Sequence, residues 1–295
     1  LLLICSCGQP SSNTQKKNFL LIQGNCMGTT YTIKYHDPEN RDLSKAIDSI
    51  LHILDKETLS TYSDSSTIGI FNQNKKLTLS QEDHVDIHFL QNLEYSREVY
   101  QDSKGAFDPT VMPLVNYWGF GFKEREMVKR DTAKIASILQ YVGMDLLQDS
   151  IRDDKVYLRS EHDSLMLDFS GVAKGYATEV VAHFLKGKDI GDYYIEVGGE
   201  LALGGQNPSG THWVIGVNEP TVGSEISEIY QTLQLSDCFV ASSGNYRNYY
   251  QLDERIISHT INPKTGFPER NNILSTTVIC NRGAYADAWA TAGMV

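Results

Sequence analysis

Hydrophobic residues recur every three or four positions through the first two thirds of the chain, and this spacing predicts amphipathic helices. The second helix opens at Ser80, with Asp83 three residues later as in a capping box. The third begins at Asp131 and is expected to stop at Gly143, because glycine ends many helices. The predicted helices span residues 43–54, 80–99, 131–142, 172–186 and 288–295.

The pattern changes to an alternation of period two near residue 193, which predicts strands. Shorter strands are predicted earlier, at residues 19–22 and 30–36, and a hairpin is predicted from residues 155–159 and 164–169. The later strands are expected at 193–203, 212–217, 226–235, 239–242, 249–252, 256–261 and 273–280. Early helices followed by a strand meander favour an α+β fold in a single domain, with a largely antiparallel strand-rich region.

Composition and charge exclude several classes of function. The 295 residues carry 26 basic and 37 acidic side chains, a net charge of −11, and no basic stripe, which argues against a nucleic-acid partner. No run of 18 apolar residues could span a bilayer, and no CxxC pair suits a zinc site. The chain lacks a Walker P-loop, a Rossmann fingerprint, an HExxH helix and a GxSxG elbow, so the enzyme classes that use them are not expected.

The first eight residues read Leu-Leu-Leu-Ile-Cys-Ser-Cys-Gly and resemble the end of a bacterial lipoprotein signal. In this interpretation Ser6 precedes a lipidated Cys7, Cys5 leaves with the signal, and the polar residues up to 18 form a tether. The alternative is a core strand with two buried cysteines. We expect residues 1–18 to be a truncated signal and tether of an exported, lipid-anchored protein. Residues 19–295 would form the domain, with an incomplete C-terminus.

Two motifs in the middle of the chain carry candidate chemistry, and each also has a structural interpretation. Gly105-Ala-Phe-Asp-Pro-Thr is a turn before an aromatic cluster that reaches Gly121, so it is either a packed turn or a flat surface for a ring. Residues 167–176 are predicted to lead from a strand that ends on Asp168 into a helix. Asp168 then either caps that helix or accepts a hydrogen bond from a ligand. Lys174 in the first turn opposes the helix dipole, which favours an anionic partner.

Two further motifs lie toward the C-terminal end. Residues 258–266 lead from a strand into an Asn-Pro turn, with His259 at the strand end in either a structural or a functional role. Asp287 and Thr291 are four residues apart, so their oxygens share one helix face and suit a hard cation such as Mg²⁺. In the competing interpretation, Asp287 in the first turn only matches the helix dipole and Thr291 bonds to its own helix.

Together and in this order, these motifs resemble the ApbE family of bacterial flavin transferases, the FAD:protein FMN transferases. The resemblance starts near Met27 and covers nearly the whole chain. It also includes residues 27–31, 60–63, 71–72, 196–200 and 242–246. It implies one α+β domain, and it agrees with the lipoprotein start, since many members of the family are exported lipoproteins.

The resemblance also implies the site residues. The positions that match FAD-binding residues of the family are Met27, Tyr62, Ala106, Phe107, Asp108, Asp168, Lys174, His259 and Ile261. The family carries either Glu or Lys at the position of Lys174. Mg²⁺ would be held by the side chains of Asp287 and Thr291 and by the backbone carbonyls of Gly171 and Ala290.

The implied reaction is Mg²⁺-dependent transfer of FMN from FAD to a threonine hydroxyl of a partner protein, with release of AMP. The partners would be acceptor domains of exported or membrane redox flavoproteins facing the periplasm. His259 is the best-suited base for the hydroxyl, because histidine ordinarily titrates near neutral pH; alternatively it only contacts FAD. Two other functions fit the same motifs, an FAD pyrophosphatase that yields FMN and AMP, and a non-catalytic FAD-binding lipoprotein.

Overall fold

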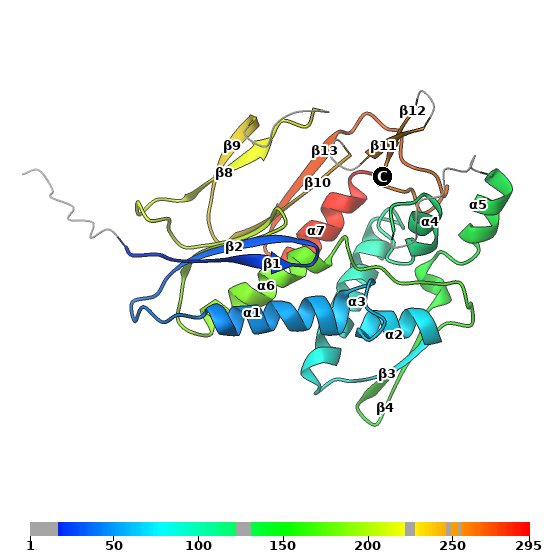
Figure 1. The fold of residues 1–295 in the computed structure, drawn as a ribbon, viewed down its shortest axis with the longest axis horizontal. Helices are drawn as coiled ribbons and strands as arrows, with labels where there is room; N and C mark the ends of the chain where they lie inside the picture. Colours follow the sequence, from blue (N-terminus) through cyan, green and yellow to red (C-terminus); the bar gives the residue numbers. More distant parts are fainter. Residues whose placement is uncertain (1–16, 122–130, 222–227, 246–248, 253–254) are drawn as a thin grey trace, which may run out of the picture.

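The structure of the chain is a computed structural model that describes residues 17–121, 131–221, 228–245, 249–252 and 255–295 (Figure 1). Cys5 and Cys7 lie outside these residues, so the lipid anchor stays a prediction. Within the described ranges, no helix combines the length and the apolar character needed to cross a bilayer.

A six-stranded antiparallel sheet forms the centre of the fold, in the order β1-β2-β6-β7-β10-β13 (Figure 1). Its strands are β1 (Leu20–Cys26), β2 (Thr29–His36), β6 (Asp192–Val197), β7 (Glu200–Gly204), β10 (Cys238–Gly244) and β13 (Ser275–Cys280). Tyr31, Ile33 and Tyr35 of β2 alternate into the core, as the sequence pattern predicts. In β7 all five residues are buried, so this strand is covered on both faces.

Helices cover one face of this sheet and a hairpin covers part of the other. α6 (Ala173–Lys186) and α7 (Gly283–Ala292) pack on the sheet, and α1 (Ser44–His52) and α3 (His84–Asp102) pack outside them. On the other face, β8 (Trp213–Asn218) and β9 (Ile229–Leu235) form the hairpin. Trp213 and Ile215 of β8 form an apolar cluster with Leu201, Leu203 and Val240 of the sheet.

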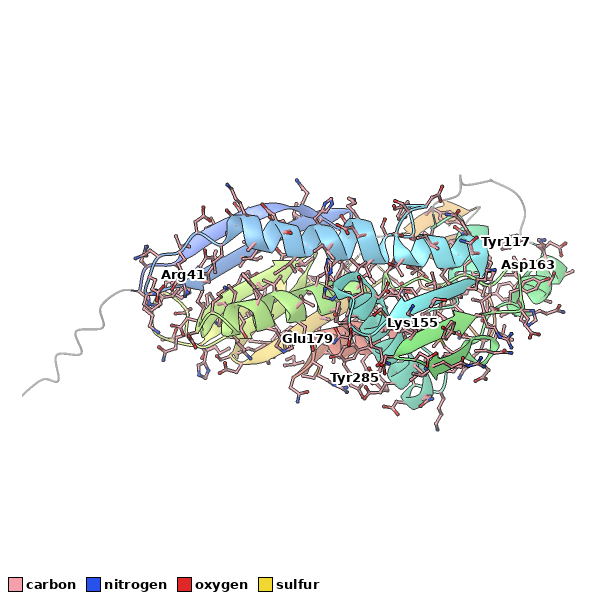
Figure 2. The ribbon with its side chains drawn as sticks, turned by 90° about the horizontal axis from the view of Figure 1, so that it is seen from below. Arg41, Tyr117, Lys155, Asp163, Glu179 and Tyr285 are labelled. Carbon is pink, nitrogen blue, oxygen red and sulfur yellow. The ribbon has the colours of Figure 1, made fainter. Side chains whose placement is uncertain are left out.

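The α6 and α7 helices touch through their backbones. A Cβ atom on Gly175 would lie 2.2 Å from the carbonyl oxygen of Gly283, so only glycine permits this approach. Figure 2 shows Glu179 on α6 near α7; its carboxylate accepts hydrogen bonds from the backbone N–H groups of Gly283 (2.7 Å) and Ala284 (3.2 Å). The hydroxyl of Tyr95 donates to its other oxygen. Glu179 therefore caps the start of α7 from a neighbouring helix.

Smaller elements surround this layer. The remaining helical segments are the π-helical η1 (Ile53–Leu59), α2 (Thr67–Asn74), α4 (Met112–Tyr117), α5 (Thr132–Leu139) and the 3₁₀ turn η2 (Met144–Leu146). The remaining strands are β3 (Lys76–Ser80), β4 (Gln148–Arg152), β5 (Lys155–Arg159), β11 (Tyr249–Leu252) and β12 (Arg255–Ser258). β3, β5 and β4 form a sheet in that order, and β11 pairs with β12.

The α+β class and the single domain are confirmed, whereas several element predictions are wrong. The hairpin partner of β5 is β4, through a turn in which Asp153 and Asp154 both have positive φ, and residues 164–169 form no strand. α3 begins at His84 with Asp83 as its N-cap, because Ser80 is the last residue of β3. α5 ends at Leu139 and not at Gly143.

Two boundary errors affect the site. The strand predicted over residues 193–203 is two strands, β6 and β7, separated by Gly198 and Gly199, which both have positive φ. α7 begins at Gly283, so Asp287 is not in its first turn. The dipole interpretation of Asp287 loses its support, because that effect is confined to the terminal turn.

Candidate functional site

A cavity of about 550 Å³ lies where α6, α7 and the ends of β7, β10 and β12 meet. It brings together segments that are far apart in the sequence. The predicted site residues that line it are Tyr62, Ala106, Phe107, Asp108, Asp168, Gly171, Lys174, His259, Ile261, Asp287 and Thr291. Met27 and Ala290 are not among the lining residues.

The side chains of Met27 and Ala290 pack against apolar parts of the protein. Met27 is in the turn between β1 and β2, with φ of 50°, and it packs against the main core. Ala290 is fully buried on α7 in a small cluster with Ala241 and Ala286. The predicted FAD contact of Met27 and the predicted metal contact of the Ala290 carbonyl stay predictions.

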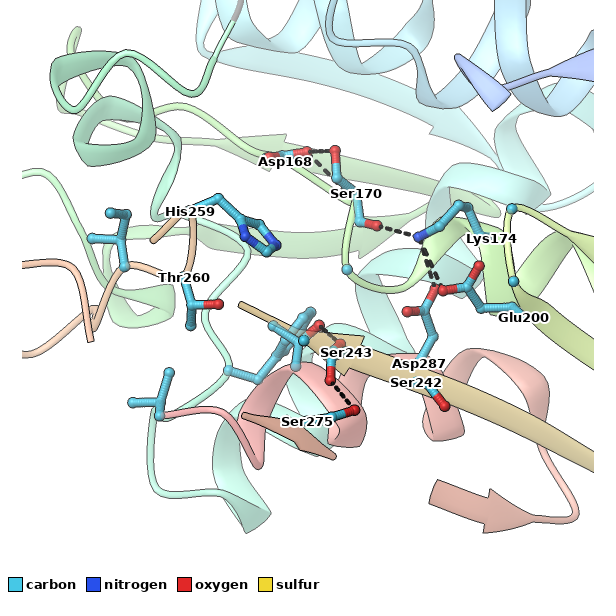
Figure 3. Close-up of a pocket in the computed structure, with 18 of the residues that line it drawn as sticks. Asp168, Ser170, Lys174, Glu200, Ser242, Ser243, His259, Thr260, Ser275 and Asp287 are labelled. Carbon is cyan, nitrogen blue, oxygen red and sulfur yellow. Dashed lines mark hydrogen bonds and ion pairs between the residues drawn. The ribbon is translucent and has the colours of Figure 1, made fainter. Parts of the chain in front are cut away.

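Three charged side chains meet on one side of the cavity (Figure 3). The ammonium Nζ of Lys174 lies 3.3 Å from Oε1 of Glu200 and 3.9 Å from Oδ2 of Asp287. It also donates to the carbonyl oxygen of Ser170 at 3.3 Å. The sequence motifs did not single out Glu200 as a site residue. The available signal was an acidic residue at the start of an otherwise apolar strand.

The charges in this group perturb one another. Burial raises the pKa of Glu200 above its usual value, whereas the neighbouring ammonium of Lys174 favours the charged carboxylate. Burial alone would lower the pKa of Lys174, but the carboxylates of Asp287 and Glu200 outweigh burial and raise it above its usual value. Lys174 therefore keeps its positive charge inside the cavity.

Asp287 and Thr291 face the cavity from α7, as their spacing predicts. The backbone N–H of Gly175 donates to Oδ2 of Asp287 at 2.9 Å, and Oγ1 of Thr291 lies 3.4 Å from Oγ of Ser243. A Cβ atom on Gly171 would lie 3.0 Å from Oγ1 of Thr291, so the Gly171 backbone closely approaches this hydroxyl. The glycine thus leaves the Thr291 oxygen accessible from the loop before α6.

This donor set fits Mg²⁺ better than a transition metal. Among the described residues, no group of three or more His, Cys, Asp or Glu side chains has metal-binding geometry. Asp287 offers one carboxylate, Thr291 one hydroxyl, and Gly171 a closely packed backbone. Mg²⁺ is commonly held by one or two carboxylates together with waters and substrate phosphates.

Two aspartates line the cavity from loops. Asp168 accepts hydrogen bonds from the backbone N–H and the hydroxyl of Ser170, and burial raises its pKa. It neither ends a strand nor caps α6, whose N-cap is Val172 without a side-chain bond. Asp108 accepts from the N–H and hydroxyl of Thr110, and burial raises its pKa to about 6.

His259 directly follows β12, as predicted, and its ring lies 6.3 Å from the Phe120 ring in an edge-on arrangement. The turn after it is held by Asn262, whose side-chain oxygen accepts from the N–H of Lys264. Trp118 donates its indole N–H to the carbonyl oxygen of Gly266 at 2.8 Å. Figure 3 shows the His259 ring apart from Lys174, on a different side of the cavity.

Hydroxyl groups form another part of the wall, and the sequence motifs did not assign them. Oγ of Ser242 lies 2.8 Å from Oγ1 of Thr277 on the neighbouring strand, and Ser275 donates to the carbonyl oxygen of Ser243. The signal was the change from apolar to hydroxyl residues at the end of β10. This wall offers neutral hydrogen-bonding groups to a polar ligand.

Comparisons with known proteins agree with one another. The ApbE family model matches residues 27–295. An FAD:protein FMN transferase of Vibrio cholerae is 33% identical over 299 residues, which cover 100% of this chain and 85% of the relative. One of Escherichia coli K12 is 30% identical over 291 residues, with 97% and 81% covered.

Two solved structures share the fold. The flavin transferase ApbE from Vibrio cholerae superposes with a TM-score of 0.80 at 31% identity, covering 94% of this chain and 87% of that one. The apo form of the Pseudomonas stutzeri flavinyl transferase ApbE gives a TM-score of 0.80 at 32% identity, covering 95% and 85%.

Proposed function

The chain belongs to the ApbE family, and we propose that it is a flavin transferase that moves FMN from FAD to a threonine hydroxyl of a partner protein and releases AMP. In this reaction the threonine oxygen forms a bond to the phosphorus of the FMN half. The bond from that phosphorus to the bridging oxygen breaks, and AMP leaves with this oxygen. The hydroxyl proton passes to a base.

The observation that carries the proposal is the composition of one cavity. Asp287 and Thr291, which offer oxygens suited to a cation, line the cavity beside the charged Lys174, and His259 lines the same cavity. A pyrophosphate ester with two negative charges needs positive charge around it, and a hydroxyl nucleophile profits from a base. A protein that only stored FAD would not need a cation at the phosphates.

Mg²⁺ would be held by the side chains of Asp287 and Thr291, with backbone carbonyls of Gly171 and Ala290 beside them. When bound, it supplies positive charge that stabilises the pyrophosphate oxygens as the bond to AMP breaks. Lys174 adds a fixed positive charge on the same wall, and His259 accepts the proton of the acceptor threonine. Asp108 and Asp168 offer hydrogen-bond acceptors for polar groups of FAD, and Tyr62 and Phe107 offer ring surfaces.

The family membership and the N-terminal sequence support an expectation for the acceptor and for the location. We expect the partner to be an exported or membrane-bound redox flavoprotein domain with an accessible threonine. A lipid on Cys7 would hold the enzyme at the membrane surface on which such domains face the periplasm.

The test is to incubate the protein with FAD, Mg²⁺ and a candidate acceptor domain, and then to determine the acceptor mass and the free nucleotides. A gain equal to one FMN on the acceptor, with AMP released, supports the proposal. FMN and AMP in solution with an unchanged acceptor would indicate a pyrophosphatase instead. Unchanged FAD would indicate a carrier. An acceptor with the target threonine replaced by alanine is the matched control.

A further inference from the structure

The turn between β6 and β7 packs against the Lys174 side chain. Gly198 has a φ of 60°, and a Cβ atom there would lie 3.1 Å from Cδ of Lys174. The turn is fixed by a bond from the Gly198 N–H to the carbonyl oxygen of Thr30 and by one from the Gly199 N–H to the carboxylate of Glu196. Glu200 follows at once and meets the ammonium group, so one short segment holds both the stem and the charge of Lys174.

One carboxylate oxygen of Glu200 is an unsatisfied hydrogen-bond acceptor among the described residues. The residue is 5% exposed, and its Oε2 has no hydrogen-bond partner among the described residues, whereas Oε1 pairs with Lys174 at 3.3 Å. A buried carboxylate oxygen without a partner is unusual in native proteins and calls for an explanation. Glu200 lines the same cavity as Lys174 and Asp287.

The two carboxylates compete for one ammonium group. Lys174 is closer to Glu200, at 3.3 Å, than to Asp287, at 3.9 Å, which is beyond hydrogen-bonding distance. If Glu200 were absent, Asp287 would be the remaining carboxylate within ion-pair distance of Lys174. The Lys174 ammonium would then pair with the Asp287 carboxylate and compete with a divalent cation for it.

We propose that Glu200 is a positioning residue that holds the Lys174 ammonium away from Asp287, so that a divalent cation and Lys174 can occupy the cavity together. When a bound cation repels the Lys174 ammonium, Oε2 of Glu200 can accept a hydrogen bond from the displaced ammonium. This inference rests on the proposed cation site at Asp287 and Thr291. It assigns Glu200 an effect that acts through Lys174 and requires no contact with the cation itself.

The experiment is a double-mutant cycle on Mn²⁺ binding, measured by electron paramagnetic resonance of the free ion without FAD and repeated by Mg²⁺ competition. Glu200→Gln should weaken Mn²⁺ binding about tenfold, or ~1.4 kcal/mol, in the presence of Lys174. Lys174→Met alone should change the Mn²⁺ affinity by less than about threefold, because Glu200 already keeps the lysine away from Asp287 in the native protein. In the Lys174→Met background, Glu200→Gln should have almost no further effect.

Glu196→Gln is the matched control, because Glu196 lies on β6 just before the same turn, does not line the cavity, and keeps an acceptor oxygen for the Gly199 N–H when it is replaced by glutamine. It should leave Mn²⁺ affinity unchanged. An equal loss from Glu200→Gln in both backgrounds would overturn the proposal, since Glu200 would then act as a ligand or as a simple charge. No loss in either background would overturn it as well.

Lys174→Met and one further variant, Asp287→Asn, keep the result unambiguous. If Glu200→Gln does not fold, Lys174→Met still decides, because more than tenfold tightening would mean that Lys174 blocks Asp287 in the native protein, against the proposal. Asp287→Asn should abolish Mn²⁺ binding. Native binding in that variant would overturn the cation site itself. Loss of binding there, without the Lys174-dependent effect, would overturn only the role of Glu200.

Discussion

The backbone N–H of Gly175 on α6 donates a hydrogen bond to the carboxylate of Asp287 on α7, with 2.9 Å between nitrogen and oxygen. The bond is buried and joins two helices whose backbones are in contact at Gly175 and Gly283. The first turn of one helix therefore orients the carboxylate that the other helix presents to the cavity. The Asp287 carboxylate thus both accepts this hydrogen bond and faces the cavity, so an informative substitution must change one of these functions and keep the other.

Asp287→Asn should reduce FMN transfer at least ~10²-fold while leaving the melting temperature nearly unchanged. Asparagine removes the charge that is proposed to bind the cation but keeps an oxygen for the Gly175 N–H. Asp287→Ala also leaves that buried N–H without a partner, which costs about 1–3 kcal/mol of stability. Transfer assays and thermal melts on both variants separate the two effects. Native transfer rates for Asp287→Asn in Mg²⁺ would contradict the cation assignment.

His259→Ala should slow single-turnover transfer by about 10²–10⁴ if the residue is the base, with FAD affinity near that of the native protein. If His259 only contacts FAD, the dissociation constant rises and transfer at saturating FAD stays near normal. Measuring FAD affinity and single-turnover transfer on the same variant distinguishes these roles. Normal transfer at saturating FAD would remove His259 as the base.

Gly175→Ala should destabilise the protein by about 1–3 kcal/mol, because the added Cβ would lie 2.2 Å from the Gly283 carbonyl oxygen and force α6 and α7 apart. Gly187→Ala is the matched control at the end of the same helix, where the nearest contact is 3.4 Å and φ is −65°. Urea unfolding of both variants measures the difference. Equal stability of the two would show that the helix contact is not tight in solution.

Asp108 should make stability depend on pH between about 4 and 6. Burial raises its folded-state pKa to about 6. The folded protein therefore holds this proton more tightly than the unfolded chain, and the contribution of Asp108 to stability falls as pH rises through that window. Asp108→Asn has no carboxyl group at this position and should not lose stability in this way. The unfolding free energy of the variant minus that of the native protein should therefore increase between pH 4 and pH 7, by at most about 3 kcal/mol.

The measurement for Asp108 is urea unfolding at several pH values without FAD. Asp64→Asn, at an exposed position, is the control for the loss of one acidic side chain. A pH-independent difference between Asp108→Asn and the native protein would contradict the assignment of this titration to Asp108.

Cys7→Ser should release the exported protein from the membrane fraction. Two or three acyl chains on Cys7 would anchor it stably, at roughly 0.8 kcal/mol for each buried CH₂ group. Fractionation followed by immunodetection checks the distribution, and Cys5→Ser should stay membrane-bound as the control. A Cys7→Ser protein that remains in the membrane fraction would contradict the lipid anchor.

The sequence predicted those parts of the fold whose signals are local. α6 was predicted because apolar spacing and a terminal glycine, Gly187, coincide within one segment. The start of α7 was missed because its capping group is Glu179, 104 residues away, and the side chain of the local N-cap, Arg282, does not cap the helix. Similarly, nothing local distinguishes β4 from residues 164–169 as the partner of β5.

The same limit applies to the site. Asp287 and Thr291 were predicted because helical spacing alone places them on one face. Glu200 was not singled out, because its importance comes from Lys174, which belongs to another element and approaches it only in the folded chain. Met27 and Ala290 were included by family position; their side chains pack in apolar clusters, and their contacts with FAD and Mg²⁺ stay predictions.

The burial of β7 on both faces affects how strongly dissolved salt can screen the charges at its first residue. Glu200 opens this strand and meets Lys174 away from bulk solvent, whereas Arg97 and Asp149 form an ion pair on the surface. Dissolved salt screens exposed charges over roughly 8 Å at physiological ionic strength and screens buried ones much less. The balance of charge around Lys174 should therefore persist across wide changes in the salt content of the surrounding medium.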